Sequence, residues 1–424
     1  MFTVVGALTG LCLAIVMIVR KATPAYALVL GAFAGGIIGG GGLQDTVSAI
    51  VGGSQSMMPS VLRILTSGIL AGALVKTGSA EKMAGAIVGV FGPRFALAAV
   101  AVAAMIVTAV GVFVDIAVIT VAPVALAVGR RAGLPVPALL LAMVGGGKAG
   151  NVISPNPNTI AAADAFGLDL TALMMKNIVP ALCALAVTVA LSSWLARRIA
   201  RKGGAAVHET AMREGSSAGD GRLPGILAAA AGPVVVVVLL AMRPVCGIGI
   251  DPLIALPAGG FASILACGKW RDAGACCEFG LSKVAGVAIL LIGTGAVAGI
   301  IKNSGLNSGM IQFLEACRLP AFALAPLSSL LLSGATASTT AGVTIASQTF
   351  AGALAQAGVP SLSAAAMLHA GGTVFDALPH GSFFHATAGA VGMSVKDRLK
   401  LFPFGTLAGA TSMIVSVLMY LAGF

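Results

Sequence analysis

The chain has 424 residues, of which 58% are hydrophobic and only 9% are charged, and its mean hydropathy is +1.03. Soluble domains carry roughly a quarter charged residues. The composition therefore excludes an ordinary soluble enzyme and predicts an all-α polytopic membrane protein. The formal net charge of +11 lies mainly in short basic segments between apolar stretches, so we expect no nucleic-acid partner.

Apolar stretches of about 20 residues, long enough to cross a ~30 Å hydrocarbon core, recur from end to end. They cover 4–19, 24–42, 60–75, 136–166, 170–195, 223–242, 252–268, 281–301, 361–391 and 401–423. Two further stretches, 95–129 and 319–357, are too long for one span and are punctuated midway, which predicts re-entrant hairpins. No basic residue precedes 4–19, so we expect it to be a retained span rather than a cleaved signal peptide.

Basic residues predict the orientation. The segment 196–222 is rich in arginine and lysine, and loops of this kind lie in the cytoplasm. If both long stretches leave the membrane on the side from which they enter, most of the other lysines and arginines fall on that same side. The charge pattern thus agrees with the re-entrant interpretation.

An internal repeat is visible in the sequence. SGILAGALVKTGSAEKM (67–83) matches TGAVAGIIKNSGLNSGM (294–310), and GGGKAGNVISP (145–155) matches AGGTVFDALPH (370–380). In the predicted topology the two copies run in opposite directions across the membrane. Inverted repeats with interrupted spans are typical of secondary transporters. Chance similarity between glycine- and alanine-rich helices is the alternative, and two matches in register argue against it.

The repeat predicts the domain organisation. The predicted parts are N-terminal scaffold helices in 1–59, a first inverted repeat in 60–195 with hairpin 95–129 and broken helix 136–166, a cytoplasmic linker in 196–222, scaffold helices of the second half in 223–268, and a second inverted repeat with the last helix in 281–424, with hairpin 319–357 and broken helix 361–391.

The stretch GGGKAGNVISPNPNTIAAADAFG (145–167) breaks an apolar segment with glycine, proline and asparagine. Such a break persists at membrane depth only where it is buried in protein or lines a polar cavity. The half-helix ends that it creates, together with Lys148, favour an anion. We therefore predict a carboxylate-binding site that includes Lys148 and Asn151; an ordinary loop outside the membrane is the alternative.

The matching stretch of the second half is HAGGTVFDALPHGSFFHATAG (369–389). An ionisable group in an apolar span is expensive and suggests a function, and histidine titrates near physiological pH. Asp376 and His380 are therefore candidates for proton coupling. The alternative is that Asp376 pairs internally with Lys148 or caps a half-helix.

The two long punctuated stretches add polar groups near their middles. Asp115 lies in the first and is a third candidate for proton coupling. The second carries hydroxyl side chains suited to a hydroxylated carboxylate: Ser333, Thr336, Ser338, Thr339 and Thr340. We take Ser338, Thr339 and Thr340 as candidates for substrate binding, although such hydroxyls in membrane helices often bond back to their own backbone.

At ISPNPNT (153–159) and FDALPH (375–380) the sequence resembles the gluconate:proton symporter family of bacterial permeases, within the ion transporter superfamily. The resemblance implies a dimeric inner-membrane protein that imports sugar acids or short hydroxy acids with protons. It further implies scaffold helices that hold still while a transport unit moves across the membrane. The residues that it places at the site are Ser154, Asn156, Asn158, Thr159, Asp376, His380 and Ser382.

Two departures from the family pattern refine this expectation. Phe383 and Phe384 follow Ser382, which makes the wall of the pocket bulkier. The Ser-Asn-Thr signature of sodium-coupled dicarboxylate relatives is absent from both hairpin tips, so we expect proton coupling. A sodium-coupled or exchange-type di- or tricarboxylate transporter and an anion channel are the alternatives.

No enzymatic motif accompanies these features. The four histidines form no HExxH or equivalent motif, and the seven cysteines show no metal-ligand spacing. We therefore expect no enzyme activity, no metal and no cofactor. The expected partners are a small organic anion, protons, the lipid bilayer and a second copy of the chain.

Overall fold

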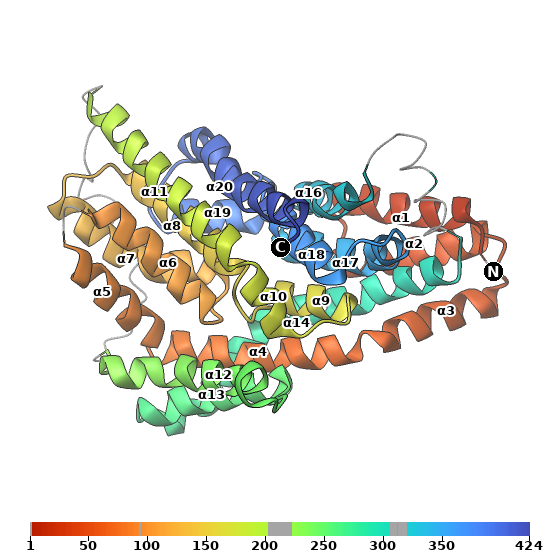
Figure 1. Ribbon diagram of the computed structural model, residues 1–424, viewed down its shortest axis with the longest axis horizontal. Helices are drawn as coiled ribbons and strands as arrows, with labels where there is room; N and C mark the ends of the chain where they lie inside the picture. Colours follow the sequence, from red (N-terminus) through yellow and green to blue (C-terminus); the bar gives the residue numbers. More distant parts are fainter. Residues whose placement is uncertain (1, 93–94, 202–222, 306–311, 313–319) are drawn as a thin grey trace. The chain divides into compact units, whose positions relative to one another are not determined.

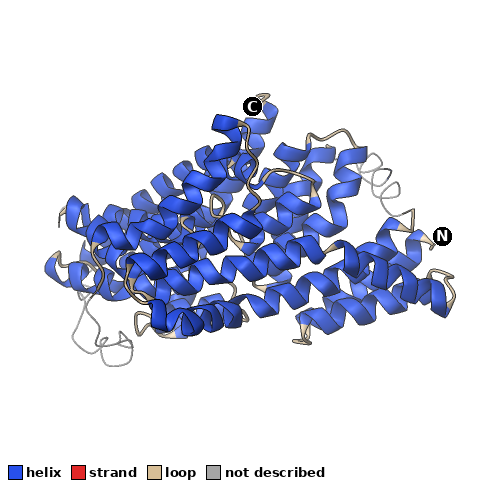
Figure 2. Cartoon of the chain, turned by 90° about the horizontal axis from the view of Figure 1, so that it is seen from below, coloured by secondary structure: helices blue, strands red, loops and turns tan. Residues whose placement is uncertain are grey.

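The computed structural model describes residues 2–92, 95–201, 223–305, 312 and 320–424. Most of the predicted cytoplasmic linker, the last residues of the 294–310 repeat segment and the first residue of the 319–357 hairpin lie outside this part. In the described residues the regular elements are helices (Figure 2). This confirms the expected all-helical fold.

Figure 1 labels these elements along the chain. In chain order they are α1 Val4–Val19, α2 Pro24–Ile38, α3 Leu43–Ser56, α4 Met58–Lys76, α5 Ser79–Phe91, α6 Ala96–Ala109, α7 Val114–Arg131, α8 Val136–Asn151, α9 Pro157–Ala165, α10 Leu170–Lys176, α11 Ile178–Arg201, α12 Ile226–Cys246, α13 Pro252–Ala266, η3 Trp270–Asp272, α14 Ala273–Lys302, η4 Ala321–Ala323, α16 Leu324–Thr336, α17 Thr339–Gln356, α18 Ser361–Gly372, α19 Ser382–Gly389 and α20 Val395–Leu421.

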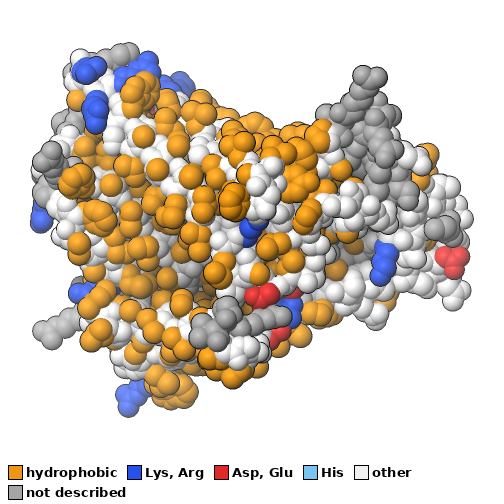
Figure 3. Space-filling model, viewed as in Figure 1, with side chains coloured by type: hydrophobic (Ala, Val, Ile, Leu, Met, Phe, Trp, Pro, Cys, Tyr) orange, Lys and Arg blue, Asp and Glu red, His pale blue; other side chains and the backbone are white. Residues whose placement is uncertain are grey.

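Many of these helices have an apolar composition suited to a lipid environment. Among the described residues, four helical segments are long and apolar enough to cross a membrane: Met58–Lys76, Ile178–Arg201, Trp270–Lys302 and Val395–Leu421. Hydrophobic side chains cover much of the face drawn in Figure 3, and soluble proteins rarely expose apolar patches of that extent. Shorter apolar helices such as α1, α2 and α6 accompany the long ones.

The hairpins and broken helices predicted from the sequence are present. The stretch 95–129 folds as α6 and α7, and 319–357 contains α16 and α17. The stretches 136–166 and 361–391 each fold as two short helices, α8 with α9 and α18 with α19. The order of elements is therefore repeated in the two halves, whereas their depth in a membrane stays a prediction.

Two helices, α3 and α5, were not expected. Each carries polar and charged residues, Gln44 and Asp45 in α3 and Glu81 and Lys82 in α5, so neither is apolar enough to register as a span. α3 leads almost directly into α4, because Met57 between them keeps a helical conformation.

The chain divides into two compact units. Unit 1 comprises Met1–Leu65, Pro157–Lys176 and Val284–Asp376, and unit 2 comprises Thr66–Asn156, Asn177–Lys283 and Ala377–Phe424. Two of the boundaries fall at the breaks, between Asn156 and Pro157 and between Asp376 and Ala377. Each broken helix thus contributes one half to each unit.

The exchange of half-helices is reciprocal. In unit 1 the hairpin α16–α17 and half-helix α18 of the second repeat pack with half-helix α9 of the first repeat. In unit 2 the hairpin α6–α7 and half-helix α8 of the first repeat pack with half-helix α19 of the second. The division by packing therefore cuts across the division by sequence repeat, which stays a prediction.

Candidate functional site

The first break separates α8 from α9. α8 ends at Asn151, and Pro155 and Pro157 lack the backbone N–H that a continuing helix requires. Pro157 then begins α9, a position where its missing donor costs nothing. The predicted interruption at 145–167 is thus confirmed as a short non-helical segment.

Glycines hold the buried half-helix α8 against the hairpin helix α6. A Cβ added to Gly146 would lie 2.1 Å from the Ala101 carbonyl oxygen, and one on Gly150 would lie 2.2 Å from that of Met105. Any larger residue would push the two backbones apart. The glycine-rich run therefore serves close packing as well as the break itself.

Lys148 lies inside this packed half-helix and is 3% exposed. Its Nζ donates a hydrogen bond to the Gly405 carbonyl oxygen of α20 at 3.2 Å. Burying an ammonium group is costly without partners, and the carbonyl supplies one of them. Lys148 is thus a buried basic side chain in the half-helix that precedes the break, as its place in an apolar stretch predicts.

Amide groups close the break. The Asn156 amide donates to the Asn151 backbone oxygen at 2.8 Å and to the Asn151 side-chain oxygen at 2.6 Å. This satisfies a carbonyl that the end of α8 leaves without a helical partner. Ser154 is buried in the same unit, and Asn158 and Thr159 are buried in the first turn of α9 in unit 1.

The second break runs from Gly372 to Ser382. Asp376 lies in it and is 1% exposed. The Thr339 hydroxyl, at the first position of α17, donates to the Asp376 carboxylate at 2.7 Å. The structure thus brings two predicted site residues together in unit 1, one from a hairpin tip and one from a broken helix.

The other hydroxyls at this hairpin tip have local roles. The Thr336 hydroxyl bonds back to the Leu332 carbonyl at 2.8 Å, which is the structural alternative foreseen for such residues. Ser338 caps α17 by accepting the Ala341 N–H at 3.3 Å. Ala337 makes the turn with a φ of +47°, and Thr340 is partly buried.

The remaining candidates lie elsewhere on the second break and the first hairpin. His380 and Ser382 are exposed residues of unit 2. Phe384, in contrast, is buried, and the Arg398 guanidinium lies 5.3 Å from its ring centre. Asp115 is partly buried in the first turn of α7, where its charge also suits the helix N-terminus.

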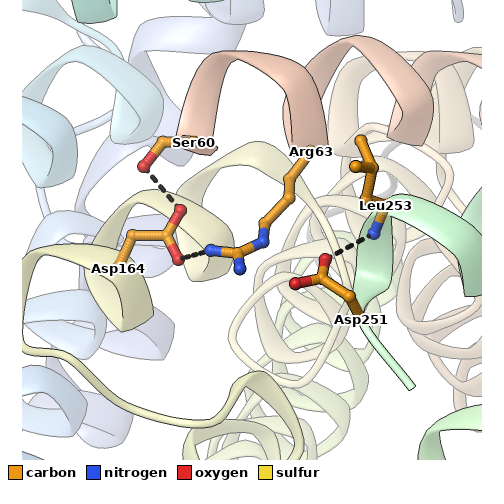
Figure 4. A network of polar contacts seen from close by, with 5 residues as sticks. All are labelled: Ser60, Arg63, Asp164, Asp251 and Leu253. Carbon is orange, nitrogen blue, oxygen red and sulfur yellow. Dashed lines mark hydrogen bonds and ion pairs between the residues drawn. The ribbon is translucent and has the colours of Figure 1, made fainter. Parts of the chain in front are cut away.

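The sequence analysis missed an ion pair in unit 1. Arg63 of α4 and Ser60, one turn earlier, both bond to the carboxylate of Asp164 on α9 (Figure 4). Arg63 and Asp164 each fall inside a predicted apolar stretch, and that position is the signal that identifies them. Asp251, also drawn in Figure 4, has a local role in unit 2, because it caps α13 by accepting the Leu253 N–H at 2.8 Å.

The last helix begins earlier than the apolar stretch predicted from 401 to 423. α20 begins at Val395 rather than near 401, because the Ser394 hydroxyl accepts the Asp397 N–H and caps the helix. Arg398 therefore lies in the first turn of α20 and is buried.

Comparisons with known proteins agree with this architecture. A family model described as GntP family permease matches residues 2–258. The chain is 50% identical over 417 residues to an "Uncharacterized transporter" of Haemophilus influenzae, covering 98% of this chain and 97% of that protein. It is 22% identical over 362 residues to a "Gluconate permease" of Zymomonas mobilis, covering 80% of each.

A solved structure shares the fold. The Alcanivorax borkumensis YdaH transporter, described as having an unusual topology, superposes with a TM-score of 0.68 over 90% of both chains at 16% sequence identity. At that identity the likeness concerns the fold alone. The family model, however, matches residues 2–258, which is more than half of this chain. The Haemophilus relative is 50% identical and covers 98% of the chain. The protein thus belongs to the GntP family of permeases and is a multi-pass membrane transporter.

Proposed function

We propose that this permease imports a small hydroxy-carboxylate or sugar acid, with gluconate as the reference substrate, by symport with protons. The observation that carries the proposal is Lys148, a buried cation beside a broken helix in a membrane transporter. The name of the Zymomonas relative supports a gluconate-like substrate.

The anion-binding step is assigned to unit 2. The bond that Lys148 Nζ donates to the Gly405 backbone is to a neutral carbonyl oxygen. A carboxylate offers the ammonium a charge-assisted bond, which is roughly twice as strong as a bond to a neutral acceptor. Asn151, Ser154 and Asn156, buried along the same break, supply amide and hydroxyl groups for the hydroxyls of the substrate.

The proton-binding step is assigned to Asp376 in unit 1, with Asp115 and His380 as the other candidates. Asp376 is held by the Thr339 hydroxyl at the point where the chain passes from unit 1 to unit 2. A change in its charge acts on the break itself, so it can favour one arrangement of the half-helices over another. This gives proton binding a direct route to the transport movement.

The wider setting is also part of the proposal. We take the protein to be a homodimer of the bacterial inner membrane that works as an elevator, with a mobile transport unit and a static scaffold. The family resemblance supports each of these statements. The two hairpins and two broken helices are the elements that such a transport unit requires.

The test is uptake of ¹⁴C-gluconate into proteoliposomes that contain the purified protein. We expect accumulation when the outside is acidic, none without a gradient, and exchange of internal for external gluconate in both cases. Protein-free liposomes are the control, and unlabelled succinate and citrate test competition. Uptake that follows a sodium gradient at equal pH, or leak that no gradient drives uphill, would contradict proton symport.

A further inference from the structure

His369 is a buried side chain for which the proposed function has no role. It lies in α18 and is 0% exposed, and both of its ring nitrogens lack a hydrogen-bond partner among the described residues. A neutral imidazole offers one donor and one acceptor. Leaving both unmade in a buried position is costly, so such a group calls for a functional explanation.

Two serines of α16 share this property. Ser329 and Ser333 are both 0% exposed, and within the described part of the chain their hydroxyls have no partner. They lie four residues apart and so face the same side of α16. That side is turned toward α18, since a Cβ on Gly372 would lie 2.8 Å from the Ser329 oxygen and 3.3 Å from the Ser333 oxygen.

Glycines make the space for these hydroxyls. A Cβ added to Gly342 of α17 would lie only 2.0 Å from the Ser333 oxygen. Gly342 in α17 and Gly372 in α18 therefore leave room for polar atoms where any other residue would fill the space. The hydroxyls lie at the meeting point of three helices of unit 1.

Along the chain, this meeting point lies between two ionisable groups, one in α18 and one in the break that follows it. His369 precedes Gly372 by one helical turn, and Asp376 follows it by four residues. On α17, Thr339 precedes Gly342 by one turn, and its hydroxyl is bonded to the Asp376 carboxylate at 2.7 Å. Polar groups thus extend from Asp376 through Thr339, Ser333 and Ser329 toward His369.

Few other charges compete in this region. The helices that pack most extensively on α18 are α9, α10, α16 and α17. α16 and α17 carry no titratable side chain in the described residues, α9 carries Asp164, which is paired with Arg63, and α10 carries Lys176 at its last position. His369 and Asp376 are therefore the groups of this region suited to exchange a proton.

We propose that His369 is a second proton-binding site, connected to Asp376 by this row of buried hydroxyls. The inference rests on the proposed proton symport and deepens it. Ordered water is common beside buried polar groups that lack protein partners, and it would bridge the gaps in the row. The row would let the coupled proton move into the core of unit 1.

The transfer conserves atoms and charge. The Thr339 hydroxyl donates to the Asp376 carboxylate in this structure, so it must turn to accept the proton of the protonated acid. Each hydroxyl oxygen or water then accepts one proton and releases another, and the last proton binds the unprotonated ring nitrogen of His369. No electron moves. The pair changes from a neutral acid and a neutral imidazole to a carboxylate and an imidazolium, so the net charge of the buried region stays the same. The cost of forming two buried charges must be offset by their attraction and by the hydroxyls and water that bond to them.

The first test removes the proposed site. His369→Gln should lose proton-driven accumulation of gluconate, which a gradient of one pH unit sustains at about tenfold for one proton per substrate. Exchange of gluconate should be affected much less, because it needs no net proton movement. His385→Gln is the matched control, since His385 is exposed and bonded to the Pro379 carbonyl at 2.7 Å. Full accumulation by His369→Gln would overturn the inference.

The second test breaks the row without touching either end. Ser329→Ala and Ser333→Ala should slow proton-driven uptake several-fold. Ser328→Ala should not, because the hydroxyl of this neighbouring buried serine donates to its own helix at Ala325, 3.1 Å away. If all three variants behave alike, the hydroxyl row carries no proton.

A spectroscopic measurement decides the case even if His369→Gln fails to fold or gluconate is not the substrate. The chain has four histidines, so ¹⁵N-histidine NMR of the purified protein can assign each signal by substitution. We expect the His369 signal to change protonation state with pH, and this change to shift in Asp376→Asn but not in Ser328→Ala. A His369 signal that stays neutral throughout would overturn the inference, even where wild-type protein accumulates gluconate. A signal that responds to Asp376 while gluconate is not accumulated would instead reject only the proposed substrate or coupling.

Discussion

At the first broken helix the buried ionisable side chain of the described residues is Lys148, whereas at the second they are His369 and Asp376. The backbone packing at the two places is the same in kind. Gly146 brings α8 onto hairpin helix α6, and Gly371 brings α18 onto hairpin helix α16, with an added Cβ 2.4 Å from the Pro326 carbonyl oxygen. The comparison teaches that the two halves share a way of packing, while their buried side chains differ: a lysine in one and a histidine and an aspartate in the other.

The two breaks also differ in how their polar groups are satisfied. Asn156 closes the first break through bonds to Asn151, its neighbour in sequence. Asp376 is held instead by Thr339, 37 residues away at a hairpin tip. We infer that the first break is locally rigid and suited to hold a substrate, whereas the second responds to movement of its hairpin.

The largest expected effect comes from removing the cation at the first break. Lys148→Met should lower gluconate uptake by about ten- to hundredfold, because a hydrogen bond to a charged group contributes ~1.5–3 kcal/mol and 1.4 kcal/mol is a factor of ten. Initial rates in proteoliposomes measure it. Lys400→Met is the control, since the Lys400 side chain of α20 is 75% exposed. Wild-type uptake by Lys148→Met would show that Lys148 does not bind the substrate. The proposed difference in function between the two breaks would then have no support from this residue.

The next effect concerns the acid at the second break. Asp376→Asn resembles the protonated carboxylic acid in charge and shape, so it should exchange gluconate yet fail to concentrate it. The lost accumulation is about tenfold for one proton and one pH unit. The measurement is the steady-state ratio of internal to external ¹⁴C-gluconate. If the variant still concentrates substrate, the coupling role passes to His380 or Asp115.

A smaller effect tests whether the first break is rigid. Asn156→Ala removes both bonds to Asn151 and leaves a buried carbonyl without that donor, which costs about 1–3 kcal/mol. We expect uptake to fall several-fold while yield and the elution volume in size-exclusion chromatography stay normal. Thr336→Val is a useful comparison at the other repeat, because the Thr336 hydroxyl bonds within its own helix. Equal losses from the two substitutions would indicate a general packing effect rather than a role of Asn156 in the site.

The sequence predicted most of the helices because apolar length and glycine, proline and asparagine breaks are local signals. α1 occupies the predicted stretch from 4 to 19, and the interruption after Asn151 follows from the prolines beside it. α3 and α5 were not predicted, because the search looked for apolar spans and these helices carry polar residues such as Gln44 and Glu81.

The positions of the two breaks were predictable from the sequence, but the contacts within them were not. Glycine and proline content located both breaks, and a charge in an apolar stretch pointed to Lys148 and Asp376. The bond between Thr339 and Asp376 depends on how α17 packs against α18, which no local pattern encodes. The pairing of Arg63 with Asp164 was not predictable either, because the sequence shows each residue only as a single charge within an apolar stretch.

The smallest expected effect is that of sodium. A hard cation such as sodium needs several oxygen ligands at one point, and the turn of the first hairpin, from Val110 to Phe113, has no side-chain oxygen. At the second tip, Thr339 bonds to the Asp376 carboxylate and Ser338 caps α17, so these two hydroxyls already serve the proposed proton site and the helix end. Replacing sodium by choline at constant pH should therefore leave gluconate uptake unchanged within the error of the assay. An absolute sodium requirement would contradict proton coupling. It would indicate that sodium, rather than a proton, binds at the second break.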